Sequence, residues 1–121
     1  KLASDLSMPV EDRHVILVED IIDTGRTVSY LKRNLETRRP RSVRLCALLD
    51  KIERREVEVD IDYRGFTIPD VYVVGYGLEH AGLYRNLPHL AVLDAVCAAG
   101  RPGRARRCSL ILSPDAILRR T

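Results

Sequence analysis

The chain has 121 residues and a formal net charge of +3, with 45% hydrophobic and 31% charged residues, which suits one globular domain and is too short for two. Five Tyr, one Phe and no Trp leave too few rings for a base-stacking platform on single-stranded nucleic acid, and no apolar run approaches the roughly 20 residues of a membrane span. Three cysteines without a CxxC pair argue against a zinc site or a disulfide scaffold, so we expect a soluble chain in the reducing cytoplasm.

The first predicted elements are a strand, a helix and a second strand. Residues 14–19, HVILVE, form a short apolar run that predicts a strand buried on both faces. From Thr27 the apolar residues fall at helical spacing, and Pro40 closes a helix of about three turns. A second apolar run follows at residues 43–49. This order is typical of a βαβ unit with adjacent parallel strands, so we predict an α/β fold.

Three further strand candidates lie beyond this unit. Residues 57–63 alternate apolar and polar side chains, which predicts a half-exposed strand. Residues 71–74 form a third apolar run, and residues 89–93 can form a last short strand. We therefore predict one α/β body over residues 1–93.

Residues 94–121 differ from this body in charge and in pattern. They carry six Arg and two Asp, a net charge of +4, whereas residues 1–93 carry a net charge of −1. The basic character therefore belongs to the tail and gives no support to nucleic-acid binding by the body. Because the tail has no sustained period, we predict a disordered or poorly packed extension. A phosphate-binding basic arm and an artefact of a frame shift are the alternatives.

The most informative segment is VILVEDIIDTGRT, residues 15–27. Ligands of an open α/β sheet bind where a strand passes into a helix, and here Thr24-Gly25-Arg26-Thr27 stands at that junction. A helix N-terminus cradles a phosphate, and glycine lets the backbone approach it closely. The junction also holds three carboxylates, which suit sugar hydroxyls or a hard cation such as Mg²⁺: Glu19, Asp20 and Asp23.

These features together predict a site for a ribose 5-phosphate. The alternative for the same residues is purely structural. Thr24 or Thr27 would then cap the helix, and the three carboxylates would form a solvated acidic loop.

The segment EDIIDTGRT, residues 19–27, resembles the phosphoribosyl-pyrophosphate signature of type I phosphoribosyltransferases, in the spelling of the hypoxanthine-guanine branch. YRGFTIPD at residues 63–70 and VYVVGYGLEHAGLYRNLP at residues 71–88 resemble the purine-binding and C-terminal region of the same branch. The resemblance covers residues 10–93. It implies a partial type I phosphoribosyltransferase fold, a parallel sheet with flanking helices, without the upstream strands and loops of the family.

The resemblance implies a purine salvage enzyme that transfers 5-phosphoribosyl from phosphoribosyl pyrophosphate to hypoxanthine or guanine, giving IMP or GMP plus pyrophosphate. It also implies Mg²⁺ as cofactor, no nucleic-acid or membrane partner, and a homo-oligomeric parent protein, a dimer or tetramer. Because the upstream loops of the family are not among these 121 residues, we expect the chain alone to be inactive. A non-catalytic, RNA-binding relative is the alternative. Asp23 favours the enzyme, since its acid group suits proton chemistry.

Residue roles also follow from the resemblance. Glu19 and Asp20 would hold the ribose 2- and 3-hydroxyls, with Mg²⁺ nearby. Asp23 would be the general base or acid near purine N7, and residues 23–27, Asp23-Thr24-Gly25-Arg26-Thr27, would bind the 5-phosphate.

The remaining roles concern the purine and the pyrophosphate. Lys51 would donate to the purine 6-oxo group, Tyr72 would stack on the ring, and the Val73 backbone would read the Watson–Crick edge. Arg85 would contact pyrophosphate. Glu79 would be a metal-associated acid, at a position where the branch usually has Asp. The alternatives are a solvated Lys51, a core Tyr72 and an Arg85 that pairs with a neighbouring acid.

Overall fold

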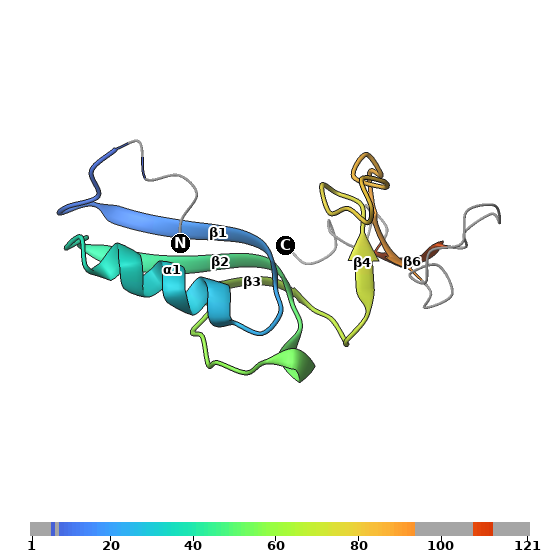
Figure 1. Ribbon diagram of the computed structural model, residues 1–121, viewed down its shortest axis with the longest axis horizontal. Coiled ribbons are helices and arrows are strands. Elements are labelled where there is room, and N and C mark those ends of the chain that lie inside the picture. Colours follow the sequence, from blue (N-terminus) through green and yellow to red (C-terminus); the bar gives the residue numbers. More distant parts are fainter. Residues whose placement is uncertain (1–5, 7, 94–107, 113–121) are drawn as a thin grey trace. The chain divides into compact units, whose positions relative to one another are not determined.

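The computed structural model describes residue 6, residues 8–93 and, as backbone, residues 108–112 (Figure 1). Contacts divide the chain into two compact units, residues 1–70 and residues 71–121, and each unit is described by itself. No helix in the described part of the chain is long and apolar enough to cross a membrane.

Unit 1 is built on a parallel sheet of three strands in the order β1-β2-β3. Its elements are β1 (His14–Ile22), α1 (Arg26–Glu36), β2 (Ser42–Asp50), the short 3₁₀ helix η1 (Ile52–Arg54) and β3 (Tyr63–Thr67). The helix connects β1 to β2, and the two strands pair in parallel. The predicted βαβ unit and the α/β fold are therefore confirmed, with β1 running three residues further than the apolar run. The prediction that this strand is buried on both faces is wrong: Leu17 packs against the core cluster, whereas Ile16 and Val18 on the opposite face are 58% and 70% exposed.

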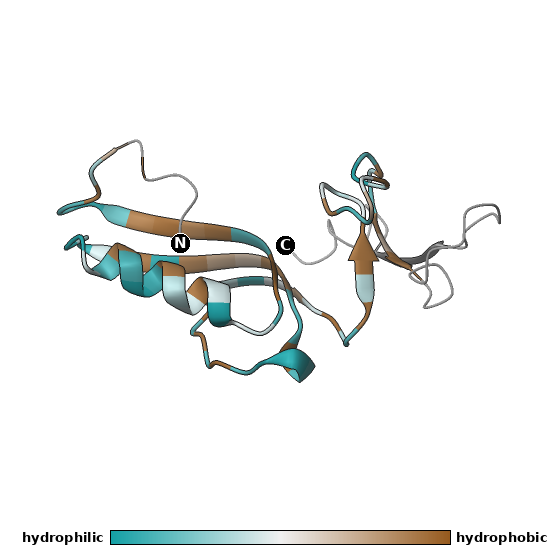
Figure 2. Ribbon diagram, viewed as in Figure 1, coloured by the Kyte–Doolittle hydropathy of each residue, from teal (hydrophilic) through white to brown (hydrophobic). Residues whose placement is uncertain are grey.

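The core of unit 1 lies between α1 and the sheet. Val28 of α1 packs with Ile22, Leu45 and Ala47 of the strands in one buried cluster. Figure 2 shows hydrophobic residues along β1 and β2 and hydrophilic residues over much of α1. This is the pattern of a helix that buries one stripe of its surface against a sheet. The packing of Val28 in the same cluster as Ile22 holds the first turn of α1 beside the end of β1.

The predicted strand at residues 57–63 is wrong, because only its last residue lies in a strand, β3. The alternation of burial is nevertheless present over residues 57–62, with the apolar residues half-buried and the acidic residues exposed. Val59 and Ile61 pack against the core cluster of unit 1 without joining the sheet. Where β3 has not yet begun, the Asp62 carboxylate accepts a hydrogen bond of 2.8 Å from the Leu45 backbone N–H, so a side chain replaces a ladder bond.

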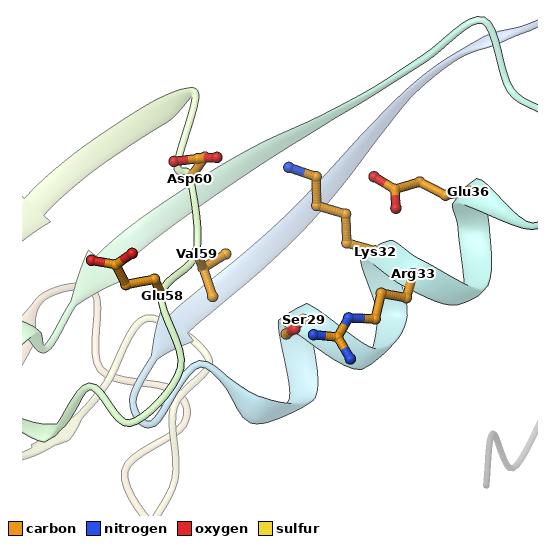
Figure 3. A pocket seen from close by; sticks show the side chains of 7 residues that line it. All are labelled: Ser29, Lys32, Arg33, Glu36, Glu58, Val59 and Asp60. Atoms are coloured by element: carbon orange, nitrogen blue, oxygen red, sulfur yellow. The ribbon is translucent and has the colours of Figure 1, made fainter.

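A pocket of about 170 Å³ lies between α1 and residues 58–60 (Figure 3). Most of its lining side chains are charged, and they come from Ser29, Lys32, Arg33, Glu36, Glu58, Val59 and Asp60. None of these residues belongs to the predicted site. The predicted site residues of unit 1 lie instead at the edge of the sheet where β1 and β2 end.

Unit 2 holds an antiparallel sheet in the order β4-β5-β6. Its strands are β4 (Tyr72–Val74), β5 (Leu90–Leu93) and β6 (Cys108–Leu112). The strands predicted at residues 71–74 and 89–93 are confirmed, whereas their antiparallel pairing and β6 had no sequence prediction. Of residues 94–121, only β6 is among the described residues, so the predicted boundary at residue 93 and the predicted state of the tail stay predictions.

Candidate active site

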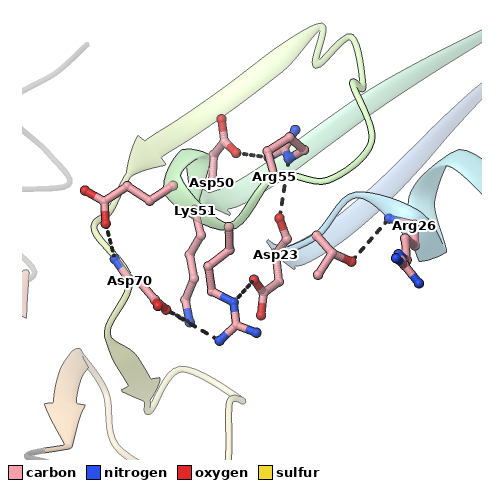
Figure 4. Close-up of polar contacts among 9 residues, drawn as sticks. Asp23, Arg26, Asp50, Lys51, Arg55 and Asp70 are labelled. Atoms are coloured by element: carbon pink, nitrogen blue, oxygen red, sulfur yellow. Dashed lines mark hydrogen bonds and ion pairs between the residues drawn. The ribbon is translucent and has the colours of Figure 1, made fainter.

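The carboxyl ends of β1 and β2 meet at one edge of the parallel sheet, and the segments that follow them lie side by side (Figure 4). The Lys51 N–H donates to the Ile22 carbonyl at 3.0 Å. Further along, the Glu56 and Val57 N–H groups both donate to the Thr24 carbonyl, at 3.0 and 3.1 Å. The loop after β1 therefore rests on the segment after β2.

The acidic pair Glu19 and Asp20 lies within β1, whereas the sequence predicted that the strand ends at Glu19 and that the pair stands at the junction after it. The strand is longer than its apolar run because β2 pairs with it as far as Ile22. The Asp20 carboxylate accepts a hydrogen bond of 2.7 Å from the Ile21 N–H. Burial, and then the charge of Asp20, raise the pKa of Glu19. Two mutually repelling carboxylates fit Mg²⁺, which proteins hold with one or two carboxylates plus water and substrate phosphates.

The predicted phosphate loop, residues 23–27, turns sharply at Gly25. This residue has φ +82°, and a Cβ there would lie 2.5 Å from the Val57 carbonyl oxygen, so only glycine fits. The N-terminus of α1 has no side-chain cap, and the Thr24 hydroxyl approaches the Arg26 N–H only at 3.4 Å. Capping is therefore not the main role of Thr24. The first-turn N–H groups of α1 are suited to bind an anion.

Asp23 and Arg26 both pair with residues of the neighbouring segment. Asp23 Oδ1 lies 2.9 Å from Arg54 Nε, and the Arg26 guanidinium forms an ion pair with Glu56. Thr27 lies exposed in the first turn of α1. The predicted residues of the loop therefore lie together. Its two charged side chains form ion pairs with Arg54 and Glu56, which the sequence did not mark as site residues.

A buried carboxylate stands behind the loop. Asp50, the last residue of β2, is 1% exposed and forms ion pairs with the guanidinium groups of Arg55 and Arg64. The Arg64 Nε lies 2.8 Å from Asp50 Oδ2. The sequence analysis did not predict this cluster, because the two arginines lie five and fourteen residues beyond Asp50 and only the fold brings them to it.

Lys51 is 7% exposed, so the alternative of a solvated lysine is wrong. Its Nζ lies 3.9 Å from Asp70 Oδ1, and Arg54 Nη1 lies 3.6 Å from the same oxygen. The Asp70 N–H donates to the Glu53 carboxylate at 3.2 Å. A buried ammonium beside one partly exposed carboxylate keeps donors for a further acceptor.

In unit 2, Tyr72 is 46% exposed, so the alternative of a core tyrosine is wrong. Its ring meets the His80 ring edge-on, with centroids 5.0 Å apart and an interplanar angle of 83°. Val73 is buried and pairs with Val92. Because β4 is an edge strand of its described sheet, its second edge is left for other acceptors and donors.

Glu79 and Arg85 lie in the loop between β4 and β5 and contact each other. Arg85 Nη2 lies 3.5 Å from Glu79 Oε1, and Arg85 Nη1 donates to the Gly77 carbonyl at 2.8 Å. The alternative that Arg85 pairs with a neighbouring acid is thus confirmed, while its contact with pyrophosphate stays a prediction. Positive φ at three non-glycine residues, Tyr76, Ala81 and Tyr84, marks this loop as strained, as functional loops often are.

The predicted residues therefore divide between the two units. Unit 1 brings the acidic pair, the phosphate loop and Lys51 to one sheet edge, and unit 2 carries Tyr72, Val73, Glu79 and Arg85. Among the residues that the structure describes, no group of three or more His, Cys, Asp or Glu side chains forms a ready metal cluster. The predicted metal set of Glu19, Asp20 and Glu79 remains a prediction.

Comparison with known proteins agrees with this geometry. The family model of the phosphoribosyl transferase domain matches residues 3–81. A hypoxanthine-guanine phosphoribosyltransferase of Mycobacterium avium is 48% identical over 94 residues, which cover 78% of this chain and 46% of that protein.

Two solved structures are similar over the same region. The hypoxanthine-guanine phosphoribosyltransferase of Bacillus anthracis is 45% identical with a TM-score of 0.75, covering 78% of this chain and 55% of that one. The Leishmania tarentolae enzyme in complex with GMP is 42% identical, also with a TM-score of 0.75, covering 77% of this chain and 55% of that one. The chain spans about half the length of each of these three relatives. It belongs to the phosphoribosyltransferase family.

Proposed function

We propose that this chain carries the ribose-phosphate and purine-binding part of a purine salvage phosphoribosyltransferase. The reaction would transfer 5-phosphoribosyl from phosphoribosyl pyrophosphate to hypoxanthine or guanine, with IMP or GMP and pyrophosphate as products. The observation that carries the proposal is the uncapped N-terminus of α1 behind Gly25, a few residues after a strand whose last residues toward the sheet edge include Glu19 and Asp20. An anion site beside two carboxylates suits a phosphate attached to a sugar diol.

The residues of unit 1 would hold the ribose phosphate. The backbone N–H groups of residues 24–27 would donate to the 5-phosphate, and Glu19 and Asp20 would accept hydrogen bonds from the ribose hydroxyls. A bound Mg²⁺ would offset negative charge on the pyrophosphate, and Glu19, Asp20 and Glu79 are the residues that would hold it. Burial and the neighbouring Asp20 charge raise the pKa of Glu19, and a bound cation would lower it again by stabilising the carboxylate.

During the transfer, the bond from ribose C1 to purine N9 forms while the bond from C1 to the pyrophosphate oxygen breaks. Positive charge develops on the sugar and negative charge on the leaving group, which Arg85 would offset. Asp23 would accept or return the purine proton near N7. Lys51 would donate to the 6-oxo group, Tyr72 would stack on the ring, and the Val73 backbone would contact the Watson–Crick edge.

The partners in this proposal are phosphoribosyl pyrophosphate and a purine base, and we expect a homo-oligomeric enzyme of the cytoplasm. The experiment is formation of IMP or GMP from the base, phosphoribosyl pyrophosphate and Mg²⁺. Because the chain spans about half of each relative, we expect little turnover from its 121 residues and turnover from a protein that supplies the remainder. Turnover by neither would contradict the proposal, and retained ribose 5-phosphate binding would then favour a non-catalytic relative.

A further inference from the structure

Arg55 joins the buried carboxylate at the end of β2 to the predicted phosphate loop (Figure 4). Its Nη2 donates to Asp50 Oδ1, and its Nε donates to the backbone carbonyl of Asp23 at 3.4 Å. The Arg55 side chain is 15% exposed and that of Asp50 is 1% exposed. The Arg55 guanidinium therefore contacts the last residue of β2 and the first residue after β1 while largely shielded from water.

The loop backbone also packs directly on Arg55. A Cβ at Gly25 would lie 3.0 Å from Arg55 Cδ, and the two residues after Arg55 donate their N–H groups to the Thr24 carbonyl. The tight turn at Gly25 is therefore formed against Arg55 and its neighbours. A shift of this arginine would move the backbone whose N–H groups face the anion site.

We infer that Arg55, anchored by Asp50, is a positioning residue that holds the backbone of residues 23–27 in its anion-binding geometry. The inference rests on the proposed function, in which this loop binds the 5-phosphate. Arg55 holds the loop without a contact to the ligand of its own. Its Nε fixes the Asp23 carbonyl, and its Cδ packs against Gly25. Rigid placement of donors before the ligand arrives is what makes an anion site effective.

The planar fork of arginine is necessary for this role. Its Nε and Nη2 serve two acceptors at once, whereas a lysine at position 55 has one nitrogen and can serve the Asp50 carboxylate or the Asp23 carbonyl. The buried Asp50 charge keeps Arg64 as a partner when Arg55 is changed. An Arg55 variant therefore does not leave an unpaired buried carboxylate, whose cost would unfold the chain.

The test measures ribose 5-phosphate binding by calorimetry with the 121-residue chain and its Arg55→Lys and Arg55→Met variants. Arg44→Met is the matched control, because Arg44 is exposed on β2 and donates to the Tyr63 hydroxyl. We expect both Arg55 variants to bind at least about tenfold more weakly, with the thermal midpoint of Arg55→Lys close to that of the unaltered chain. The control should bind as the unaltered chain does.

A second measurement separates positioning from general stability. Amide hydrogen exchange of residues 24–27 should accelerate in Arg55→Lys while exchange in β1 and β2 stays slow. Equal affinity in the unaltered chain and in Arg55→Lys would overturn the inference while leaving the phosphate site intact. A loss of affinity accompanied by faster exchange throughout the sheet would also overturn it, because the variant would then have lost general stability. An unaltered chain that does not bind ribose 5-phosphate would overturn the phosphate site, and with it this inference.

Discussion

The carboxylate of Asp23 lies 2.9 Å from the guanidinium of Arg54, measured from Oδ1 to Nε. This oxygen is shielded from solvent and accepts no aligned hydrogen bond, so the contact is one of charge. Arg54 also lies 3.6 Å from Asp70, whose carboxylate lies 3.9 Å from Lys51. Alternating charges thus connect the group proposed to handle the purine proton with the lysine proposed to bind the purine.

Asp23→Asn tests the proposed proton transfer in a protein that carries this chain and turns over. The amide keeps the size of the side chain but cannot take up a proton, so kcat should fall by about 100-fold or more. The affinity for ribose 5-phosphate should change much less, because the loop donates through its backbone. Steady-state kinetics and calorimetry measure the two quantities. An equal loss in both would show that Asp23 only holds the ligand.

The raised pKa of Glu19 makes a prediction about stability and pH. Burial and the nearby Asp20 charge disfavour its ionised form in the folded chain, so that form lowers the free energy of unfolding at pH values above the folded-state pKa. This lowering of the free energy of unfolding becomes smaller as the pH falls through that raised pKa. It is absent below the ordinary pKa of a glutamate, where the side chain is neutral in both states.

Glu19→Gln should therefore raise the free energy of unfolding near neutral pH by about 0.5 kcal/mol, a small value because solvent still screens the group. The difference should vanish in acid, below the ordinary glutamate pKa. Urea unfolding at both pH values measures it, with Glu36→Gln on the exposed surface of α1 as control. A stabilisation that persists in acid would contradict the electrostatic explanation.

The local parts of the site could be predicted from the sequence, because residues 19–27 are contiguous and their order carries the chemistry. The strand 57–63 could not, since alternation reports burial, and a segment that packs on a core without joining the sheet also alternates. The ion pairs of Asp50 depend on partners that lie five and fourteen residues further along the chain. No local pattern shows that Arg55 and Arg64 converge on it.

Lys51→Met tests the proposed purine contact. Methionine fills nearly the same buried space but cannot donate to the 6-oxo group, so KM for hypoxanthine or guanine should rise about tenfold, the value of one charge-assisted hydrogen bond. Ribose 5-phosphate affinity should stay unchanged. Lys32→Met on α1 is the control, since Lys32 lines the pocket beside residues 58–60 and has no role in the proposed purine contact. A KM unchanged by Lys51→Met would remove Lys51 from the purine site.

Gly25→Ala and Gly77→Ala separate backbone strain from collision at the phosphate loop. Both glycines have positive φ, +82° and +99°, so an alanine at either position should cost about 1–2 kcal/mol in the left-handed region. A Cβ at Gly77 meets nothing within 4 Å, whereas one at Gly25 would lie 2.5 Å from the Val57 carbonyl oxygen. That collision should cost about 1–3 kcal/mol more.

The collision also predicts a difference in binding. To make room, Gly25→Ala must move the loop away from residues 55–57, which displaces the first N–H groups of α1 and should abolish measurable ribose 5-phosphate binding. Gly77→Ala should bind the same ligand with unchanged affinity, because a Cβ at Gly77 collides with nothing and no contact with the ribose 5-phosphate is proposed for Gly77. Calorimetry on both folded variants measures this. Normal binding by Gly25→Ala would mean that the anion site does not depend on the close contact between the two segments.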